Sequence, residues 1–515
     1  MNAPALARVH ATVVHMLADA AARDAGAEAL VYQNLRLNYA EYFACVCAFA
    51  RELLALGARG ERVATLLENS IESCVAAFGV LAAGAQHVPL NPLYTPRELD
   101  FILRDAAPVV LVLDQAFAPA IEPLARQAGV RHSIVVGTGT GRLEAWRGAS
   151  AAPLDPPETG APALLQYTGG TSGKPKGVNL THRAISTNVS QREGLLPSRD
   201  GERILCMMPL SHAYGMAMGL FLAAYCAGTL VILRRYVPQD VLASVQRERI
   251  SVFPGSPTVF VGLMAHPDFP RTDWRAVRIC YSGAAPLSAR TLEHWRDAVG
   301  APVLEGYGQT EAGPVLSFNP ADGPIKPGSV GVPVPLTEIE IVDPETGCRV
   351  LAHGERGEIR ARGPQVMQGY RNLPAETSES LRDGWLYTGD IGEFDADGYL
   401  YIRDRKKDMV IVGGYNVYPR EIEEVLFLHP DVMDAAVVGA PDAYRGEVVV
   451  AFAVLRPGAR AGVDELLAHC RDNLAKYKLP ARLELTDALP RTSVNKTDKR
   501  ALKSRAAAPD PDRRT

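Results

Sequence analysis

"RVATLLENSIESCVAAFGVLAAGAQHVPLNPLYTPRELDFILRDAAPVVLVL", residues 62–113, alternates short apolar runs with longer amphipathic segments. The three apolar runs have the length and composition of buried strands, and the two segments between them are predicted to be helices. The second helix is well marked, because a capping hydroxyl, a proline in the first turn and a carboxylate three residues after the cap stand at Thr95, Pro96 and Glu98. Strands that alternate with helices predict parallel, doubly wound sheets.

The same alternation returns in residues 240–300, where "SVFPG" and "VRICYSG" are predicted strands between amphipathic helices. In doubly wound sheets, ligands bind beyond the carboxyl ends of the strands, where the loops converge. Glycine-rich segments of this chain follow predicted strands, so we expect the functional loops at those ends.

The pattern changes from about Pro333 to short strands and turns, as in "TEIEIVD", "GEIRARG" and "GYLYIRDR". A compact unit follows from about Lys407, with "PREIEEVLFLHP" and "VDELLAHCRDNLAKYKLP" as helices and "VVVAFAVL" as a strand. The predicted fold is therefore α/β: a large N-terminal domain with doubly wound sheets plus a small β-rich region, followed by a small α+β C-terminal domain. Residues 506–515 are expected to be a disordered tail.

Composition excludes several classes of protein. A formal net charge of −4 over 515 residues gives no support for nucleic-acid binding. The eight cysteines are scattered without zinc-binding spacing, which indicates reduced thiols in a cytoplasmic protein. The N-terminus lacks the basic and apolar regions of a signal peptide. Residues 215–233 carry no charge, but they divide into a helix-like half and a β-branched half, which favours a buried helix and strand over a membrane span. The sequence thus predicts no transmembrane span, and it is compatible with peripheral membrane contact.

The loop "YTGGTSGKPKGV", residues 167–178, has the composition of a phosphate-binding loop. It is not a Walker loop, because proline follows its Gly-Lys pair and Thr168 occupies the position of the first glycine. Residues 133–142 also fail as a dinucleotide fingerprint, since an arginine occupies the position of the last glycine. Kinases and GTPases of the Walker class and dinucleotide-binding enzymes are therefore disfavoured.

Residues 167–178 could still bind phosphate in another way. Glycines let backbone amides approach phosphate oxygens and form an anion-binding nest. Hydroxyl donors and positive charges are added by Thr168, Thr171, Ser172, Lys174 and Lys176. For this loop alone, a flexible surface linker is the alternative interpretation.

The loop and six further segments in fixed order resemble the adenylate-forming superfamily of acyl-CoA synthetases, luciferases and peptide-synthetase adenylation domains. These segments are "MPLSHAYG" (208–215), "YSGAAP" (281–286), "EGYGQTE" (305–311), "YTGD" (387–390), "RDRKKDMVIVGGYNVYPREIE" (403–423) and "PRTSVNK" (490–496). The resemblance covers nearly the whole chain. It implies that ATP converts a carboxylic acid into an acyl-AMP mixed anhydride with release of pyrophosphate.

The resemblance implies roles for individual residues. Thr310 would contact the α-phosphate and Glu311 would hold Mg²⁺, as suits a hard cation with oxygen ligands. Lys496 would be the catalytic lysine that bridges the attacking carboxylate and the α-phosphate. Asp390 and Arg405 would hold the ribose hydroxyls. The remaining ATP- or AMP-binding residues implied are Thr168, Gly169, Gly170, Thr171, Ser172, Gly173, Lys174, Lys176, Gly283, Ala284, Ala285, Pro286, Glu305, Gly306, Tyr307, Gly308 and Gln309.

One position departs from the superfamily pattern. Relatives often have glycine before the catalytic lysine, whereas this chain has Asn495. Asparagine tolerates left-handed backbone conformations, so the loop is expected to keep its form. The nearby Lys499 and Arg500 are predicted to be solvated charges.

The resemblance also implies an acyl pocket and a moving lid. His212, Tyr214 and Gly215 would border the acyl pocket. Residues 1–403 would form the N-terminal domain, 404–407 the hinge at Lys407, and 408–505 the C-terminal lid domain. The lid would first present Lys496 for adenylation and then present the loop around Gly413, Gly414 and Tyr415 for thioester formation with CoA.

The function implied is a carboxylic acid–CoA ligase that uses ATP, Mg²⁺ and CoA, with a medium- or long-chain fatty acid as the expected substrate. An aryl acid–CoA ligase of the benzoate or coumarate type is the main alternative, and a non-catalytic nucleotide-binding relative is another. The expected partners are the small-molecule acid and CoA, without nucleic acid. The expected state is a cytoplasmic monomer or homodimer.

Overall fold

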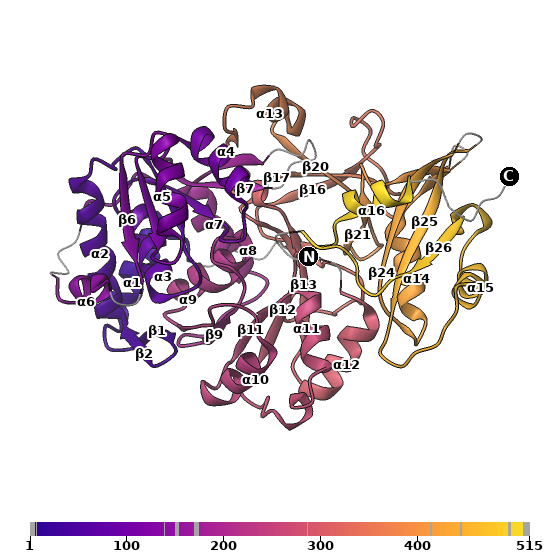
Figure 1. Cartoon of the computed structure of the whole chain (residues 1–515), viewed down its shortest axis with the longest axis horizontal. Helices are drawn as coiled ribbons and strands as arrows, with labels where there is room; N and C mark the ends of the chain where they lie inside the picture. The colour runs from indigo at the N-terminus through magenta and orange to yellow at the C-terminus, as the bar shows by residue number, and fades with distance from the viewer. Residues whose placement is uncertain are drawn as a thin grey trace. The chain divides into compact units, whose positions relative to one another are not determined.

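A computed structural model describes residues 6, 8–137, 140–149, 154–168, 175–285, 287–412, 415–442, 445–492 and 496–507. Contacts divide the chain into two compact units. Unit 1 comprises Met1–Ile339 with Ala361–Tyr387, and unit 2 comprises Glu340–Arg360 with Thr388–Thr515. Figure 1 labels many of the helices and strands of both units.

The first sheet of unit 1 has the strand order β18-β8-β7-β4-β3-β5-β6. Strands β7, β4, β3, β5 and β6 pair in parallel, whereas β8 is antiparallel to β7 and β18 is antiparallel to β8. The strands are β3 (Arg62–Leu66), β4 (Gln86–Leu90), β5 (Val110–Asp114), β6 (His132–Val136), β7 (Pro162–Thr168), β8 (Lys176–Thr181) and β18 (Gly369–Tyr370). The helices of this part of the chain are α1 (Val13–Arg23), α2 (Tyr39–Ala55), α3 (Ile71–Ala82), α4 (Pro96–Ala106), α5 (Ala118–Gln127), α6 (Arg142–Arg147), α7 (His182–Glu193) and, after β18, α13 (Pro374–Ser380).

The second sheet of unit 1 has the order β15-β14-β13-β12-β11-β9-β10-β1-β2. Its strands from β13 to β1 pair in parallel, and the antiparallel strands lie at the two ends. The strands are β1 (Glu28–Tyr32), β2 (Leu35–Asn38), β9 (Arg203–Cys206), β10 (Thr229–Ile232), β11 (Val252–Gly255), β12 (Ile279–Ser282), β13 (Val303–Gly308), β14 (Val315–Phe318) and β15 (Val332–Pro333). The helical segments are α8 (Ala213–Gly215), the π-helix η1 (Met216–Phe221), α9 (Leu222–Tyr225), α10 (Pro238–Arg247), α11 (Pro257–Met264), the 3₁₀ turns η2 (Phe269–Arg271) and η3 (Thr310–Ala312), and α12 (Ala289–Val299). The prediction of doubly wound parallel sheets is confirmed.

Two local predictions are also confirmed. Helix α4 begins with a capping box, in which Thr95 Oγ1 accepts from the backbone N–H of Glu98 at 3.3 Å and the Glu98 carboxylate accepts from the backbone N–H of Thr95 at 2.7 Å. The uncharged residues 215–233 form helical segments followed by the buried strand β10, as their division into two halves predicted. In the described part of the chain, no helix is long and apolar enough to cross a membrane.

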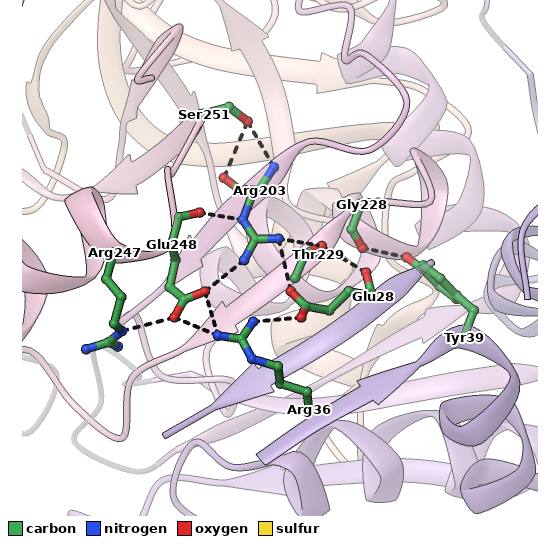
Figure 2. A network of polar contacts seen from close by, with 9 residues as sticks. All are labelled: Glu28, Arg36, Tyr39, Arg203, Gly228, Thr229, Arg247, Glu248 and Ser251. Carbon is green, nitrogen blue, oxygen red and sulfur yellow. Dashed lines mark hydrogen bonds and ion pairs between the residues drawn. The ribbon is translucent and has the colours of Figure 1, made fainter. Parts of the chain in front are cut away.

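A network of ion pairs ties the β1–β2 edge of the second sheet to its interior (Figure 2). The Arg203 guanidinium, on β9, donates to Glu28 of β1 at 3.0 Å and to Glu248, just after α10, at 2.9 Å. Arg36, on β2, donates to the same two carboxylates at 2.6 and 3.0 Å. Glu248 is buried, and its pKa stays below the ordinary value although burial alone would raise it, because Arg247, Arg36 and Arg203 favour the carboxylate.

The β-rich region forms a third sheet with the order β16-β17-β20-β19, in which β21 pairs with β20. The division between the two units passes through β16, β17 and β20. The strands are β16 (Glu338–Val342), β17 (Gly357–Arg362), β19 (Leu381–Arg382), β20 (Trp385–Phe394) and β21 (Leu400–Arg405).

The C-terminal part of unit 2 has a sheet of order β23-β22-β25-β24, with β26 beside β25. Alternate residues of β24 face two apolar clusters: Val437 packs with α14 and α15, whereas Val438 packs with α16. Helices therefore cover both faces. The elements are β22 (Val410–Val412), β23 (Tyr415–Val417), α14 (Pro419–Leu428), β24 (Val432–Asp442), β25 (Gly446–Leu455), α15 (Val463–Asn473), η4 (Lys476–Lys478), β26 (Arg482–Leu485) and α16 (Lys499–Ala506). The tail predicted at 506–515 lies outside the described residues from 508 onward.

Candidate functional site

The glycine-rich loop connects two antiparallel strands, β7 and β8, with Thr168 opposite Lys176 in the register. This topology differs from a Walker loop, which leads from a strand into a helix and uses the helix N-terminus to bind phosphate. An anion bound between β7 and β8 would therefore have no helix N-terminus of the Walker kind to hold it. The predicted site residues outside the described part of the chain are Gly169, Gly170, Thr171, Ser172, Gly173, Lys174, Pro286, Gly413 and Gly414.

Lys176 and Glu311 are connected through Tyr370, which the sequence analysis did not identify. The Tyr370 hydroxyl donates to Glu311 Oε1 at 2.9 Å, and the Lys176 ammonium lies 5.0 Å from the centre of the Tyr370 ring. Burial, with the Glu311 charge beside it, raises the pKa of Tyr370, so the hydroxyl keeps its proton and remains a donor. Strand β18 places Tyr370 there by pairing with β8 opposite Val178. A carboxylate bonded to the hydroxyl of a tyrosine and a cation beside the ring of the same tyrosine can together bind a complex of a metal ion and a phosphate.

The predicted adenine turn and the "EGYGQTE" segment begin within neighbouring parallel strands, β12 and β13, with Ser282 opposite Glu305. Glycine is required at two of these positions by close packing. A Cβ on Gly308 would lie 1.8 Å from the Pro314 carbonyl oxygen, and one on Gly306 would lie 2.2 Å from the Phe318 ring. Small residues here let the backbone of β13 approach its neighbours closely.

Ala284, in the middle of the predicted adenine turn, has φ of +69°. A left-handed backbone is unfavourable for alanine because its Cβ approaches the following carbonyl oxygen. Ala284 and the following Ala285 are exposed, so the turn offers a small, open surface to a ligand. Such strained backbone recurs at ligand-binding sites.

The remaining residues of the "EGYGQTE" segment lie at the end of β13. Glu305 is buried, and its Oε1 accepts from the backbone N–H of Leu287 at 3.1 Å, which fixes the end of the adenine turn. Tyr307 is half-buried and packs against the main apolar cluster. Gln309 caps the 3₁₀ turn η3, in which Thr310 and Glu311 are half-buried.

His212, Tyr214 and Gly215 stand at the start of α8. His212 is half-buried and caps this helix, since its Nδ1 accepts from the backbone N–H of Tyr214 at 3.2 Å. The buried Tyr214 donates from its hydroxyl to the carbonyls of Gly255 and Tyr281, each at 3.1 Å. A Cβ on Gly215 would lie 2.2 Å from the carbonyl oxygen of Pro209, so only glycine fits there. The Tyr214 ring would meet a Cβ on Gly283 at 2.8 Å, so the predicted acyl residues and the adenine turn touch.

In unit 2, three residues distant in sequence come together: Asp390 on β20, Arg405 on β21, and Lys496. Asp390 and Arg405 are opposite each other in the antiparallel register, and Arg405 Nε lies 3.7 Å from Asp390 Oδ1. Lys496 interacts electrostatically with both. Burial and the charge of Arg405 lower the pKa of Lys496, while Asp390 opposes the shift. This cluster presents two cations and one carboxylate, which suits the ribose and phosphate of a nucleotide.

Backbone contacts fix Lys496 at the base of its loop. Thr492 N–H donates to the carbonyl oxygen of Lys496 at 2.8 Å, and Lys496 N–H donates to the Thr492 hydroxyl at 3.2 Å. Thr497, the next residue, pairs with Arg491 in an antiparallel bridge. These bonds link Lys496 and Thr497 to Thr492 and Arg491.

The residues predicted for the lid movement lie in unit 2. Lys407 follows β21, and its carbonyl oxygen accepts from the Lys503 ammonium at 3.3 Å. Burial, then the positive charge of Arg405, lowers the pKa of Lys407. Tyr415 is exposed on β23 and stacks on Tyr477, with ring centroids 4.8 Å apart.

The prediction of a solvated Lys499 is wrong. The Lys499 ammonium lies 2.8 Å from Glu423 Oε1, and both side chains are largely buried. Glu423 and then Asp404 raise the pKa of Lys499 against the effect of burial, which alone would lower it. Since α16 begins at Lys499, this ion pair holds α16 against α14 three residues after Lys496.

The chain matches the family model described as "AMP-binding enzyme" over residues 17–371 and the model described as "AMP-binding enzyme C-terminal domain" over residues 421–496. It is 37% identical to a long-chain-fatty-acid–CoA ligase of Bacillus subtilis over 95% of this chain and 94% of that protein. It is also 37% identical to a feruloyl-CoA synthase of an Amycolatopsis species, over 93% and 96%. A crystal structure of an anthranilate CoA ligase in complex with anthranoyl-AMP has a TM-score of 0.91 to it, at 28% identity, over 97% and 98% of the two chains.

The fold and these motifs define an adenylate-forming ligase. The chain belongs to the AMP-binding enzyme family. The predicted superfamily, the α/β fold with a large N-terminal and a small C-terminal domain, and the class of ATP-dependent acyl-CoA ligase are thereby confirmed. The predicted domain bounds and the roles of individual site residues stay predictions.

Proposed function

We propose that the protein activates a medium- or long-chain fatty acid with ATP and transfers the acyl group to CoA. The carboxylate oxygen attacks the α-phosphorus of ATP, pyrophosphate leaves, and an acyl-AMP forms. The thiol of CoA then loses its proton, attacks the acyl carbon and releases AMP. The observation that carries this proposal is the charged cluster of unit 2, in which the Asp390–Arg405 ion pair acts electrostatically on Lys496.

Lys496 acts in the first step as a positive charge between two anions. An ammonium that bridges the attacking carboxylate and the α-phosphate offsets their repulsion and stabilises the charge that develops at phosphorus. Burial weakens the hold of Lys496 on its proton, and the negative phosphates of bound ATP restore it. Asp390 accepts from the ribose hydroxyls, and Arg405 donates to them.

In unit 1, the loop of residues 168–176 holds the β- and γ-phosphates and Thr310 contacts the α-phosphate. Mg²⁺, when bound, neutralises the charge of the triphosphate. Glu311 is the residue proposed to hold it, and Tyr370 orients that carboxylate. Across the described residues, no group of three or more His, Cys, Asp or Glu side chains could enclose a metal ion. One carboxylate therefore suits an ion whose other ligands are phosphate oxygens and water.

The fatty-acid proposal rests on the similarity to the Bacillus subtilis relative. An aryl acid is the second candidate, because the Amycolatopsis relative is a feruloyl-CoA synthase of equal identity. In either case the lid turns at Lys407 and presents residues 413–415 to CoA. We further propose that the enzyme acts in the cytoplasm as a monomer or homodimer, without nucleic acid.

The test is CoA-dependent AMP release with fatty acids of graded length, benzoate and cinnamate-type acids, for the natural chain and Lys496→Ala. The variant is expected to lose acyl-AMP formation by about a hundredfold or more while it keeps its fold. Lys476→Ala, in the exposed turn η4, is the control for loss of a lysine. Undiminished acyl-AMP formation by Lys496→Ala would refute the catalytic role, and AMP release from none of the acids would refute the proposed function.

A further inference from the structure

Arg192, near the end of α7, is completely enclosed by the protein although arginine carries a permanent charge. Its exposed fraction is 2%. The guanidinium carbon lies 5.7 Å from the centre of the Tyr281 ring, and Cys226, Tyr225 and Tyr214 also act on it electrostatically. Burial lowers the pKa of Arg192. The proposed reaction, as described above, gives this cation no role.

Arg192 has more N–H donors than the surrounding described residues offer hydrogen-bond acceptors. Its one ion pair in the described structure is with Glu193, the next residue of the helix. Both oxygens of Glu193 already accept from Ser198, from its hydroxyl at 2.9 Å and its backbone N–H at 2.8 Å. Nε and Nη1 of Arg192 have no hydrogen-bond partner among the described residues, and the buried hydroxyl of Tyr281 has none either. Buried donors without acceptors are rare in native proteins and indicate a missing water, ion or ligand group.

These unpaired donors lie beside the residues proposed for the acyl group. Tyr281 is on β12, two residues before Gly283, and its carbonyl oxygen accepts from the Tyr214 hydroxyl at 3.1 Å. Gly283 and the Tyr214 ring are in close contact. The same short segment of β12 therefore joins the acyl wall to the ring that Arg192 faces.

A wholly aliphatic chain end would leave the Arg192 and Tyr281 donors unpaired next to the substrate. An oxygen atom at that end would accept from them, and a guanidinium binds oxygen acceptors strongly in a site that excludes water. We infer that Arg192 and the Tyr281 hydroxyl form a polar subsite that binds an oxygen acceptor, either carboxylate or hydroxyl, at the end of the acid remote from the reacting carboxylate. This inference rests on the proposed function and narrows its substrate class to acids that carry a second oxygen function.

The test compares acids of equal length as substrates, for the natural protein and for its variants. The first set contains a plain fatty acid, its ω-hydroxy derivative and the corresponding α,ω-dicarboxylic acid. The second set contains cinnamate, 4-hydroxycinnamate and 4-carboxycinnamate. The measured quantity is kcat/KM for CoA-dependent AMP release. The natural chain is expected to prefer the oxygenated member of a set by about tenfold or more, because sites with buried donors discriminate against substrates that lack the acceptor. The two oxygenated members show which acceptor binds better.

Arg192→Met and the milder Tyr281→Phe are expected to lower this preference by about tenfold, mainly through loss of kcat/KM for the oxygenated acid. The ratio of the kcat/KM values for two substrates does not depend on the fraction of a variant that is folded. A purely structural role of Arg192 would therefore leave this ratio unchanged. Arg183→Met, at an exposed position of the same helix, is the matched control.

A preference for plain acids in the natural chain, or a ratio that neither variant alters, would overturn the subsite while leaving the proposed function intact. AMP release from no acid in either set would instead refute the proposed function itself. The two failures are therefore distinguishable within one experiment.

Discussion

The Tyr370 hydroxyl donates a hydrogen bond of 2.9 Å to Glu311, and the ring of the same tyrosine faces the Lys176 ammonium. One side chain thus connects the proposed Mg²⁺ ligand, Glu311, with Lys176 at the start of β8, the strand that follows the proposed phosphate loop. In Tyr370→Phe the ring remains and the donor is lost. Because Glu311 loses the bond that orients it, we expect acyl-AMP formation to slow about tenfold and the Mg²⁺ concentration for half-maximal rate to rise.

The measurement for Tyr370→Phe is a Mg²⁺ titration of acyl-AMP formation at saturating ATP. Tyr236→Phe is a suitable control, because Tyr236 donates only a weak bond of 3.4 Å to a backbone carbonyl on the α11 side of the second sheet. A Mg²⁺ dependence identical to that of the natural chain would contradict the orienting role of Tyr370.

Ala284 should tolerate glycine but not a β-branched residue, because its φ is +69°. Ala284→Val places a branched Cβ in a left-handed conformation, which is expected to cost about 1–2 kcal/mol of folding stability. Ala284→Gly is expected to change stability by less than about 1 kcal/mol, since relief of strain offsets the greater freedom of glycine in the unfolded chain. Thermal unfolding of both variants gives the comparison.

Ala285→Val is the matched control for stability, because Ala285 is also exposed and its φ is not positive. We expect its unfolding midpoint to stay close to that of the natural chain. If Ala285→Val lowered the midpoint as much as Ala284→Val, the strain assigned to Ala284 would be refuted.

The Lys499–Glu423 ion pair predicts a coupling between folding of unit 2 and the first chemical step. Lys499→Met leaves the largely buried Glu423 carboxylate without its cation, which is expected to destabilise unit 2 by about 1–3 kcal/mol. Because the first turn of α16 then loses one of its contacts, three residues after Lys496, acyl-AMP formation should slow more than transfer of a supplied acyl-AMP to CoA. Measuring the two half-reactions separately tests this.

Arg500→Met removes the adjacent positive charge from an exposed position and should affect neither half-reaction. Lys499→Arg keeps the charge and is expected to recover most of the adenylation rate. Equal slowing of both half-reactions in Lys499→Met would show that the ion pair has only a general structural role.

The sequence predicted the parts of the structure that depend on local patterns. Capping at Thr95 and the alternation of apolar runs are local, so α4 and the parallel sheets could be predicted. The antiparallel direction of β8 could not, because a six-residue strand after a glycine-rich loop has no signal for the direction in which it pairs. Lys499 was misjudged for a similar reason: its partner Glu423 is 76 residues away, and helix packing alone brings them together.

The residues of the candidate site likewise divide into those that the sequence could predict and those that it could not. Residues inside named motifs, such as Glu311 and Lys496, could be proposed from the resemblance. Tyr370 and Arg192 could not, because neither lies in a motif, and their importance comes from contacts with distant segments. A buried charge such as Arg192 is indistinguishable in sequence from an exposed one on the same helix.

Two buried histidines predict how stability depends on pH. Burial lowers the pKa of His87 to about 3, although Thr65 contacts its Nε2 at 2.8 Å, and burial lowers the pKa of His182 to about 4. The unfolded chain titrates near 6.5 and therefore binds protons at a higher pH than the folded chain does. Their contribution to stability is fully present above about pH 6.5 and is lost progressively as the pH falls towards 4.

Each of these histidines should make the free energy of unfolding fall by about 1.4 kcal/mol per pH unit in that window. Replacing one of them, as in His87→Gln or His182→Gln, removes the protonation of that imidazole, so the unfolding midpoint of the variant should fall less steeply between pH 6.5 and 4.5. Thermal unfolding at half-unit pH steps provides the slopes, with His294→Gln, at an exposed position of α12, as the control. If both variants kept the full slope of the natural chain, these two imidazoles would not be the groups whose protonation destabilises the fold in mild acid.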